Sequence, residues 1–292
     1  VLAAKRLPAA KRPRVVVTLH NLPVGSAPTR LVGKALHLVV VKGADYVLTV
    51  SPDLLEKAKQ LGLKAGEIAV VPAPARGCAD YGCMDRATQP EISQASAQSS
   101  DAGSGVDSGS GYGASSAASS KAAPCLLTIA RLAPQKGLDL LLEAATLIKQ
   151  RGIDFTWLVA GDGPLKAQLK QQIASSSLPV KLLGRREDIG ALLSQADVVV
   201  QTSYWEGQPL TLREAMQAGR AIVATDVGGS AYTLAGCGQL VEPQAGPLAD
   251  AVVAVISDPK RRETLEAASR AAVAKIPGET QLREQLDRVL AL

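Results

Sequence analysis

Short apolar runs alternate with amphipathic stretches along most of the chain, and this pattern predicts a parallel α/β fold. Near the N-terminus, the runs RVVVTLH, DYVLTVS and EIAVVP each indicate a buried strand, because parallel strands are apolar on both faces. The stretches TRLVGKALHLVVVKGA and SPDLLEKAKQLG between them indicate helices. In the second of these helices, Ser51 is suited to the N-cap position and Pro52 to the first helical position. Gly62 is suited to the position where the helix ends.

The alternation resumes at Cys125 and is stronger there. Apolar runs predict strands at 125–132, 155–161, 180–184, 197–203, 221–226 and 238–243. Helical spacing of apolar residues predicts helices at 137–152, 164–176, 187–196, 209–219, 246–259, 261–275 and 279–292. Strand and helix in strict alternation predict a parallel sheet that is covered by helices on both faces.

Between these two parts the composition changes. Residues 93–120 contain eleven Ser and five Gly, with Asp101 and Asp107 as their only charges. Such a segment buries too little apolar surface to offset the entropy of ordering it. We therefore expect a partial N-terminal domain at 1–76, a disordered linker or insertion at 77–123, a C-terminal domain at 124–275 and a final helix at 276–292.

Composition narrows the functional classes. The chain is 47% hydrophobic but has no run of eighteen apolar residues, so no transmembrane helix is predicted. The N-terminal residues lack the apolar run of a secretory signal. The four cysteines have no metal-finger spacing, histidine is scarce, and no metal site is expected. Reduced, buried thiols favour a cytoplasmic location.

The charge is uneven. Residues 1–44 carry eight Lys or Arg and no acidic residue, whereas the whole chain has a net charge of +5. A basic half of this kind indicates an anionic partner, and we expect peripheral contact with an anionic membrane through this region. A merely solvated basic surface is the alternative. Nucleic acid is not expected, because no aromatic side chains are interleaved with these charges for stacking on bases.

Two glutamates separated by seven residues, Glu206 and Glu214, lie in the stretch YWEGQPLTLREAMQAG. One continuous helix would place them about 12 Å apart along its axis. Gly207 favours a loop, and Pro209 is suited to a helix start. We therefore place Glu206 on a loop and Glu214 in the early turns of the following helix, where both carboxylates could face one ligand.

The polar clusters of the C-terminal half follow the predicted strands. Ligands of open α/β sheets bind beyond the carboxyl ends of the strands, so these loops are expected to meet at one rim. Arg131 and Lys136, in RLAPQKG, carry the fixed positive charge that suits a diphosphate. The candidate ligand-binding residues at this rim are Gly161, Gly163, Gly184, Arg185, Glu206, Gly207, Gln208, Pro209, Leu210 and Glu214.

The order of IARLAPQKG, VAGDGPLK, VKLLGR, ADVVVQTSYWEGQPLTLREAMQAGRAIVATDVGG and CGQLVEP resembles the donor-binding half of retaining GT-B glycosyltransferases of family GT4. The resemblance is strong over 125–270 and looser over 14–75. It implies a GT-B-like α/β fold with two Rossmann-like domains. It also implies transfer of a sugar, with retention, from a nucleotide-sugar substrate to an acceptor hydroxyl, without a metal or other cofactor.

The resemblance also implies roles for single residues. Glu214 would hold the nucleotide ribose and Glu206 the transferred sugar, while Arg131 and Lys136 would neutralise the leaving diphosphate. His20, which ends the run VTLH, matches a family histidine near the reacting sugar. A packed or capping histidine at a strand end is the alternative for His20. The catalytic set implied by the resemblance is therefore His20, Arg131, Lys136 and Glu206.

The N-terminal part departs from the family pattern, since the chain begins near what resembles the fourth strand of that domain. The family's Gly-rich phosphate loop has no counterpart here, which leads us to expect donor binding with slow or no transfer. Two alternatives remain open at this point. One is a non-catalytic or weakly active nucleotide-sugar-binding relative, and the other is a different GT-B enzyme such as a sugar-nucleotide epimerase. The acceptor, whether a sugar, a lipid-linked sugar or a small molecule, is not specified.

The Ser/Gly segment yields the first prediction. Replacing residues 90–120 with a short Gly/Ser linker should leave the melting temperature nearly unchanged, because long loops add little closure entropy. Differential scanning calorimetry of the full chain and the shortened chain checks this. A marked fall in melting temperature would mean that the segment packs against the folded parts.

Overall fold

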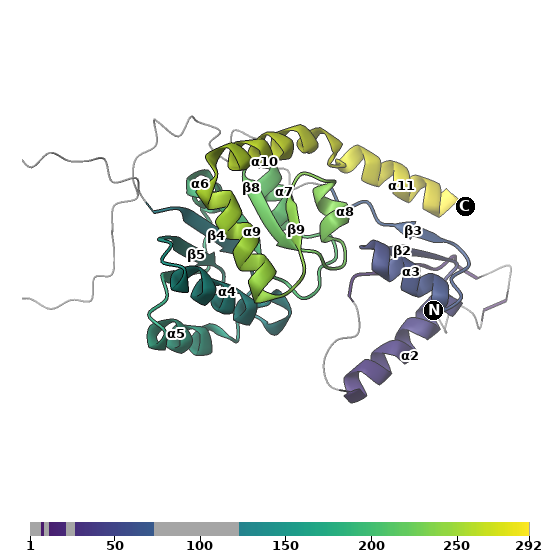
Figure 1. The fold of residues 1–292 in the computed structure, drawn as a ribbon. Helices are drawn as coiled ribbons and strands as arrows, with labels where there is room; N and C mark the ends of the chain where they lie inside the picture. The colour runs from purple at the N-terminus through teal and green to yellow at the C-terminus, as the bar shows by residue number, and fades with distance from the viewer. Residues whose placement is uncertain (1–6, 9–11, 22–26, 73–122, 292) are drawn as a thin grey trace, which may run out of the picture. The chain divides into compact units, whose positions relative to one another are not determined.

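The computed structural model describes residues 7–8, 12–21, 27–72 and 123–291, which form two parallel sheets (Figure 1). The expected linker at 77–123, apart from Ala123, lies outside these residues, as do Cys78 and Cys83. In the described ranges, no helix combines the length and the apolarity that crossing a bilayer requires. Cys125 and Cys237 are free thiols, and burial raises the pKa of Cys237.

The N-terminal sheet has three strands in the order β1-β2-β3. These are β1 (Val16–Leu19), β2 (Tyr46–Thr49) and β3 (Gly66–Ile68), connected by α2 (Ala27–Gly43) and α3 (Pro52–Gln60). The sequence predicted all five elements. The third strand is shorter than the apolar run EIAVVP, because the backbone groups of Val70 and Val71 bond to side chains of Gln285 and Arg213 instead of a strand.

The C-terminal sheet has six parallel strands in the order β6-β5-β4-β7-β8-β9. Its strands are β4 (Cys125–Ile129), β5 (Thr156–Ala160), β6 (Val180–Gly184), β7 (Val198–Gln201), β8 (Ala221–Thr225) and β9 (Gln239–Val241). The longer helices that follow these strands in sequence are α4 (Leu138–Gln150), α5 (Lys166–Ser175), α6 (Ile189–Gln195), α7 (Leu210–Gln217), α9 (Ala245–Ser257) and α10 (Pro259–Ala272), and the chain ends with α11 (Glu279–Ala291). The sequence did not predict the short turns η4 (Pro134–Lys136) and α8 (Ser230–Leu234), and η5 (Val273–Lys275) continues α10.

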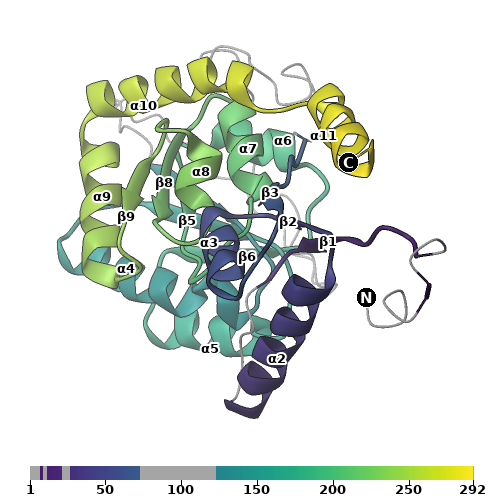
Figure 2. The ribbon, with the colours of Figure 1, turned by 90° about the vertical axis from the view of Figure 1, so that its right-hand side faces the viewer.

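Helices cover both faces of the six-stranded sheet, as the apolar strands require. Successive strand residues face opposite layers: Leu126 joins the cluster beneath α4 and α9, whereas Leu127 joins the cluster beneath α6 and α7. Figure 2 shows α4 and α9 on one side of these strands and α6 and α7 on the other. The helices therefore shield the apolar side chains on both faces of the sheet from water. The carboxyl ends of the strands are not covered in this way, and loops follow them.

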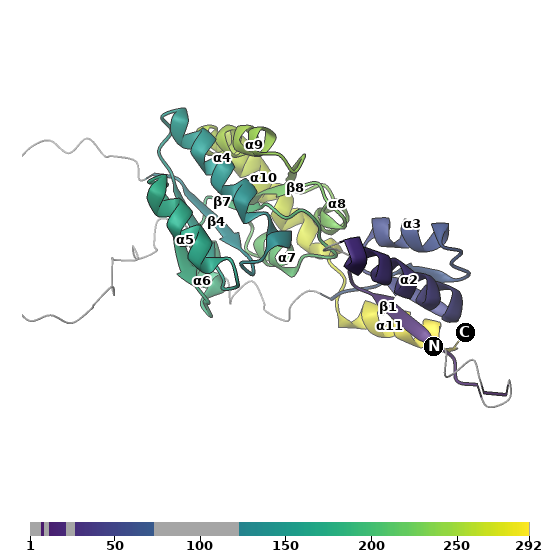
Figure 3. The ribbon, with the colours of Figure 1, turned by 90° about the horizontal axis from the view of Figure 1, so that it is seen from below.

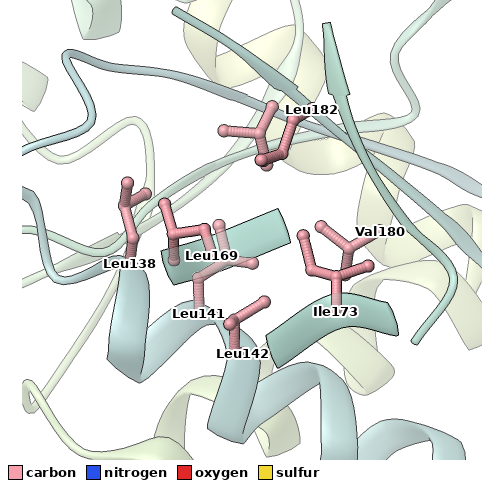
Figure 4. Close-up of a pocket in the computed structure, with 8 residues that line it drawn as sticks. Leu138, Leu141, Leu142, Leu169, Ile173, Val180 and Leu182 are labelled. Atoms are coloured by element: carbon pink, nitrogen blue, oxygen red, sulfur yellow. The ribbon is translucent and has the colours of Figure 1, made fainter. Parts of the chain in front are cut away.

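An apolar gap lies where α4 and α5 pack on the sheet (Figure 4). It is lined by Leu138, Leu141, Leu142, Val159, Leu169, Ile173, Val180 and Leu182. The gap leaves no room for a water molecule and carries no polar lining, so it is part of the packed core. The apolar face predicted for 137–152 supplies three of these side chains.

The last helix, α11, packs against the N-terminal sheet although it follows the C-terminal one in sequence. Val289 of α11 is buried in a cluster with Leu48 and Ala69. Gln285 donates from Nε2 to the Ile68 carbonyl at 2.9 Å and accepts at Oε1 from the Val70 amide at 2.6 Å. In Figure 3, α2 and α3 lie on one side of β1 and α11 on the other.

Removing the Gln285 amide should weaken this attachment. Gln285→Ala leaves the Val70 N–H and the Ile68 carbonyl without their partner, which should lower the free energy of unfolding by about 1–3 kcal/mol. Urea denaturation measures the loss, and hydrogen exchange should show faster exchange at Val70. The exposed neighbour Glu284→Ala is the matched control. Equal stability of the two variants would contradict the role given to Gln285.

Candidate functional site

The four polar loops predicted to meet do lie side by side. They follow β4, β5, β6 and β7, which are consecutive in the sheet order β6-β5-β4-β7 and run parallel. The loop after β4 contains η4 and comes very close to the loop after β7. A Cβ atom at Gly137 would lie 2.0 Å from the Thr202 carbonyl oxygen, so only glycine allows this approach.

Glu206 is the most constrained acidic group of the rim. Its side chain is buried, and Oε1 accepts hydrogen bonds from Lys136 Nζ at 2.6 Å and Ser203 Oγ at 2.5 Å. A buried carboxylate requires a partner charge, and Lys136, which closes η4, supplies it. The structure therefore brings two of the predicted site residues, Lys136 and Glu206, into a direct contact that the sequence did not predict.

Side chains and amides from three segments fix the loop that carries Glu206. The hydrogen bonds are Thr202 Oγ1 to Lys136 O at 2.8 Å, Gln135 Nε2 to Trp205 O at 2.9 Å, Thr225 Oγ1 to Ser203 O at 2.6 Å and Gly229 N to Glu206 O at 3.0 Å. Three of these bonds satisfy carbonyl groups of the loop itself, and the bond from Thr202 ties the loop to Lys136 of η4. The position of Glu206 is thus set by η4 on one side and by the segment after β8 on the other.

The second glutamate lies on a helix, as the sequence predicted. The helix α7 begins at Leu210 with Pro209 as its N-cap residue, and Glu214 lies in its second turn. Glu206 precedes it on the loop, so the two glutamates are not on one helix. Glu214 is half-buried and Leu210 is exposed. The structure thus bears out the local interpretation of this motif.

The glycines of the candidate site serve close backbone contacts between neighbouring loops. Gly161 has a φ of +145°, and a Cβ there would lie 1.9 Å from the Ala130 carbonyl oxygen. A Cβ at Gly163 would lie 2.4 Å from Leu132 O. The Gly161 amide donates to Gly184 O at 2.8 Å. These contacts hold the loops after β5 and β6 close to the loop that follows β4.

Arg131 and Arg185 carry exposed side chains at the same rim. Next to Arg131, the Leu132 amide donates to Asp162 O at 2.9 Å, which ties the loop after β4 to the loop after β5. Lys166 pairs with Asp162 at 2.7 Å and lowers the pKa of that carboxyl. The rim therefore presents the cationic side chains of Arg131 and Arg185 to solvent, while the buried carboxylate of Glu206 is paired with Lys136.

His20 and Gly207 lie near each other, although His20 follows β1 of the N-terminal sheet and Gly207 follows β7 of the C-terminal sheet. The His20 carbonyl oxygen is 3.8 Å from the position of a Cβ at Gly207, and a Val50 methyl is 2.7 Å from it. The His20 side chain is exposed. A larger residue than glycine would therefore displace the loop of Glu206 from the chain ends of β1 and β2.

The side chain of Gln208 is occupied by the protein itself. Its Nε2 donates to the Ala69 carbonyl at 2.8 Å, and its Oε1 accepts from Arg213. Arg213 is buried, also donates to the Val71 carbonyl, and has its pKa lowered by burial. Both polar atoms of the Gln208 side chain therefore already have partners within the protein.

Sequence reasoning missed several residues that hold the site. Ser203 bonds to Glu206, and Trp205 donates from Nε1 to Asp53 Oδ2 at 2.8 Å. Tyr204 donates to Asp139 Oδ2 at 2.9 Å, and burial followed by this bond raises the pKa of Tyr204 to about 12. The only available signal was their proximity in sequence to Glu206, because the partners of Tyr204 and Trp205 lie far along the chain.

Comparisons with known proteins agree with this geometry. Residues 123–258 match the family model for glycosyl transferases group 1. An alpha-D-kanosaminyltransferase of Streptomyces kanamyceticus is 33% identical over 149 residues, covering 49% of this chain. A phosphatidyl-myo-inositol mannosyltransferase of Mycobacterium tuberculosis is 34% identical over 150 residues, covering 48% of this chain. The match spans 39% of the length of each relative.

Structural similarity extends over nearly the whole chain. The structure of Anabaena Alr3699/HepE in complex with UDP and glucose superposes with a TM-score of 0.69 at 21% sequence identity. The superposition covers 97% of this chain and 72% of the other. At this identity the likeness concerns the fold. Residues 123–258 are thus similar to the glycosyl transferases group 1 domain, and the chain has the fold of GT-B glycosyltransferases.

Proposed function

We propose that this protein is a retaining glycosyltransferase that moves a sugar from a nucleotide-sugar donor to an acceptor hydroxyl. The observation that carries the proposal is Glu206, buried, held by Lys136 and Ser203, and set one loop before the helix of Glu214. A carboxylate in a fixed position can accept two hydrogen bonds from a sugar ring. The nucleotide and the sugar would occupy neighbouring positions along this motif.

Glu214 is assigned to the ribose, because a carboxylate with two oxygens can accept from two adjacent hydroxyls. Glu206 is assigned to the transferred sugar, together with the backbone N–H groups of Gly207 and Gln208. Pro209 and Leu210 lie at the start of α7, whose N-terminal amides favour negative charge. Each group would bind a different part of one extended donor.

The leaving diphosphate is assigned to Arg131 and Lys136. Negative charge grows on the diphosphate as the bond between the sugar's anomeric carbon and the diphosphate oxygen breaks. Fixed cations stabilise that charge more in the transition state than in the ground state. Arg131 is exposed and Lys136 is already oriented by Glu206. This arrangement requires no metal ion in our proposal.

The acceptor side is assigned to His20, whose exposed ring follows β1 and whose backbone lies near Gly207. The mycobacterial relative is named for a phosphatidyl-myo-inositol acceptor, and this favours a sugar or a lipid-linked sugar as the acceptor here. UDP is the first nucleotide to test, since the Anabaena structure contains it. A panel of nucleotide sugars, followed by assay of sugar transfer and donor hydrolysis, tests the proposal. The anomer of the product, read by NMR, tests retention.

The diphosphate assignment predicts a selective loss of affinity. Arg131→Ala should weaken UDP binding about 10–100-fold, because a hydrogen bond to a charged group contributes roughly 1.5–3 kcal/mol. Binding of uridine should hardly change. Calorimetry with both ligands measures this, and Arg283→Ala on α11, also exposed, is the control. Equal losses for UDP and uridine would contradict the assignment.

Lys136→Ala should show the same selectivity with an added cost in stability. The substitution leaves the buried Glu206 carboxylate without its cation, so the melting temperature should fall as well. Thermal melting in the absence of nucleotide separates this effect from the loss of UDP affinity. An unchanged melting temperature would mean that the pair does not stabilise the loop.

The ribose assignment predicts a loss of discrimination. The wild-type chain should prefer UDP over its 2′,3′-dideoxy analogue by roughly 10-fold or more, because Glu214 accepts from the hydroxyls. Glu214→Ala should bind both nucleotides with similar affinity. Glu143→Ala, an exposed glutamate on α4, should keep the preference. A Glu214→Ala variant that still favours UDP would place the ribose elsewhere.

A further inference from the structure

The loop that carries Glu206 is bonded to groups of the N-terminal sheet on both sides of this glutamate. Before it, Trp205 donates from Nε1 to Asp53 Oδ2 at 2.8 Å. After it, Gln208 donates from Nε2 to the Ala69 carbonyl at 2.8 Å. Asp53 lies in the first turn of α3, and Ala69 follows β3. The place of Glu206 relative to the N-terminal sheet therefore depends on two side chains close to it in sequence.

The indole of Trp205 is held both by packing and by its hydrogen bond. The residue is 9% exposed and lies in a cluster with Val50 and Leu54. Apolar contacts of this kind are non-directional. The bond to Asp53 is directional, and the indole N–H can only donate, so a buried indole needs an acceptor. Asp53 therefore fixes the orientation of a ring that packing alone would leave free to shift.

The Asp53 carboxylate has few other interactions. It lies in the first turn of α3, where the helix dipole favours a negative charge. Its Oδ2 accepts the indole bond, whereas its Oδ1 is buried and has no hydrogen-bond partner in the part of the chain that the structure describes. The indole of Trp205 is thus the group that Asp53 is placed to bind.

The backbone next to Trp205 and Glu206 is closely packed. A Cβ at Gly228 would lie 2.0 Å from the Glu206 carbonyl oxygen and 3.1 Å from Trp205 Nε1. A Cβ at Gly229 would lie 1.8 Å from the Gly207 carbonyl oxygen. Because neighbouring backbone fills this space, a shift of the indole would also displace the backbone of Glu206.

We propose that Asp53 is a positioning residue for the transferred sugar, acting through Trp205 on Glu206. Lys136 pairs with Glu206 but follows a strand of the C-terminal sheet, so it does not place Glu206 relative to the N-terminal sheet. Asp53 does so, because it belongs to the N-terminal sheet's helix α3 and bonds to the residue before Glu206. This inference rests on the function proposed above, in which Glu206 holds the sugar of the donor.

Calorimetry of the full chain with UDP and UDP-glucose tests the proposal. Asp53→Ala should weaken binding of UDP-glucose about tenfold, because a displaced Glu206 no longer meets the sugar. Binding of UDP should hardly change, since Arg131 and Glu214 do not depend on this bond. Asp53→Asn keeps an acceptor for the indole and should bind UDP-glucose like the wild type. So should Glu56→Ala, an exposed acidic residue of the same helix.

A double variant shows whether Asp53 acts through Trp205. Trp205→Phe removes the donor but keeps an aromatic ring against Val50 and Leu54, and it should weaken UDP-glucose binding to a similar extent. Adding Asp53→Ala should then cause no further loss, since the bond is already absent. Losses that add would overturn the proposal. Trp205→Phe leaves α3 unchanged, so it also keeps the test valid if Asp53→Ala fails to fold.

Acrylamide quenching of tryptophan fluorescence tests the same bond without a nucleotide. The chain has two tryptophans, and Trp157 is fully buried, so a change in quenching reports on Trp205. Quenching should rise in Asp53→Ala but not in Asp53→Asn or Glu56→Ala. Unchanged quenching in Asp53→Ala would overturn the proposal.

Failure of the proposed function has a different signature. A wild-type chain that binds UDP but not UDP-glucose would count against Glu206 as a ligand of that sugar. Greater quenching in Asp53→Ala would still support Asp53 as the residue that positions the loop of Glu206. Wild-type affinity of Asp53→Ala for UDP-glucose, in a chain that binds this donor, would count against Asp53 alone.

Discussion

The ion pair between Lys136 and Glu206 is the contact on which the geometry of the candidate site depends. It joins the loops that leave two adjacent strands, β4 and β7, at 2.6 Å. A carboxylate as buried as Glu206 would be costly alone, since removing an ion from water costs several kcal/mol. The pair and Ser203 offset that cost only when both loops are in place. Gly137 lets the loops approach closely enough for this to happen.

A second constraint links the candidate site to the N-terminal sheet. Arg213, one residue before Glu214, is buried and donates to the Val71 carbonyl and to Gln208. The buried guanidinium of Arg213 therefore takes one of its hydrogen-bond acceptors from the segment that follows β3. The same segment is held from the other direction by Gln285 of α11. The helix that carries Glu214 is thus anchored by polar contacts to residues that lie more than a hundred positions earlier.

The sequence by itself determined the local structure and the chemistry of the rim. Apolar periodicity located the strands and the longer helices, and Gly207 with Pro209 placed Glu206 on a loop and Glu214 on α7, because these signals act within a few residues. It also placed Arg131 and Lys136 after the same strand. Tertiary structure alone decided the distant partners: Lys136 for Glu206, Asp53 for Trp205 and Gln285 for Val70. Those bonds join residues whose separation in sequence carries no periodic signal, and α11 returns to β3 because packing there buries Val289, a gain that no local pattern encodes.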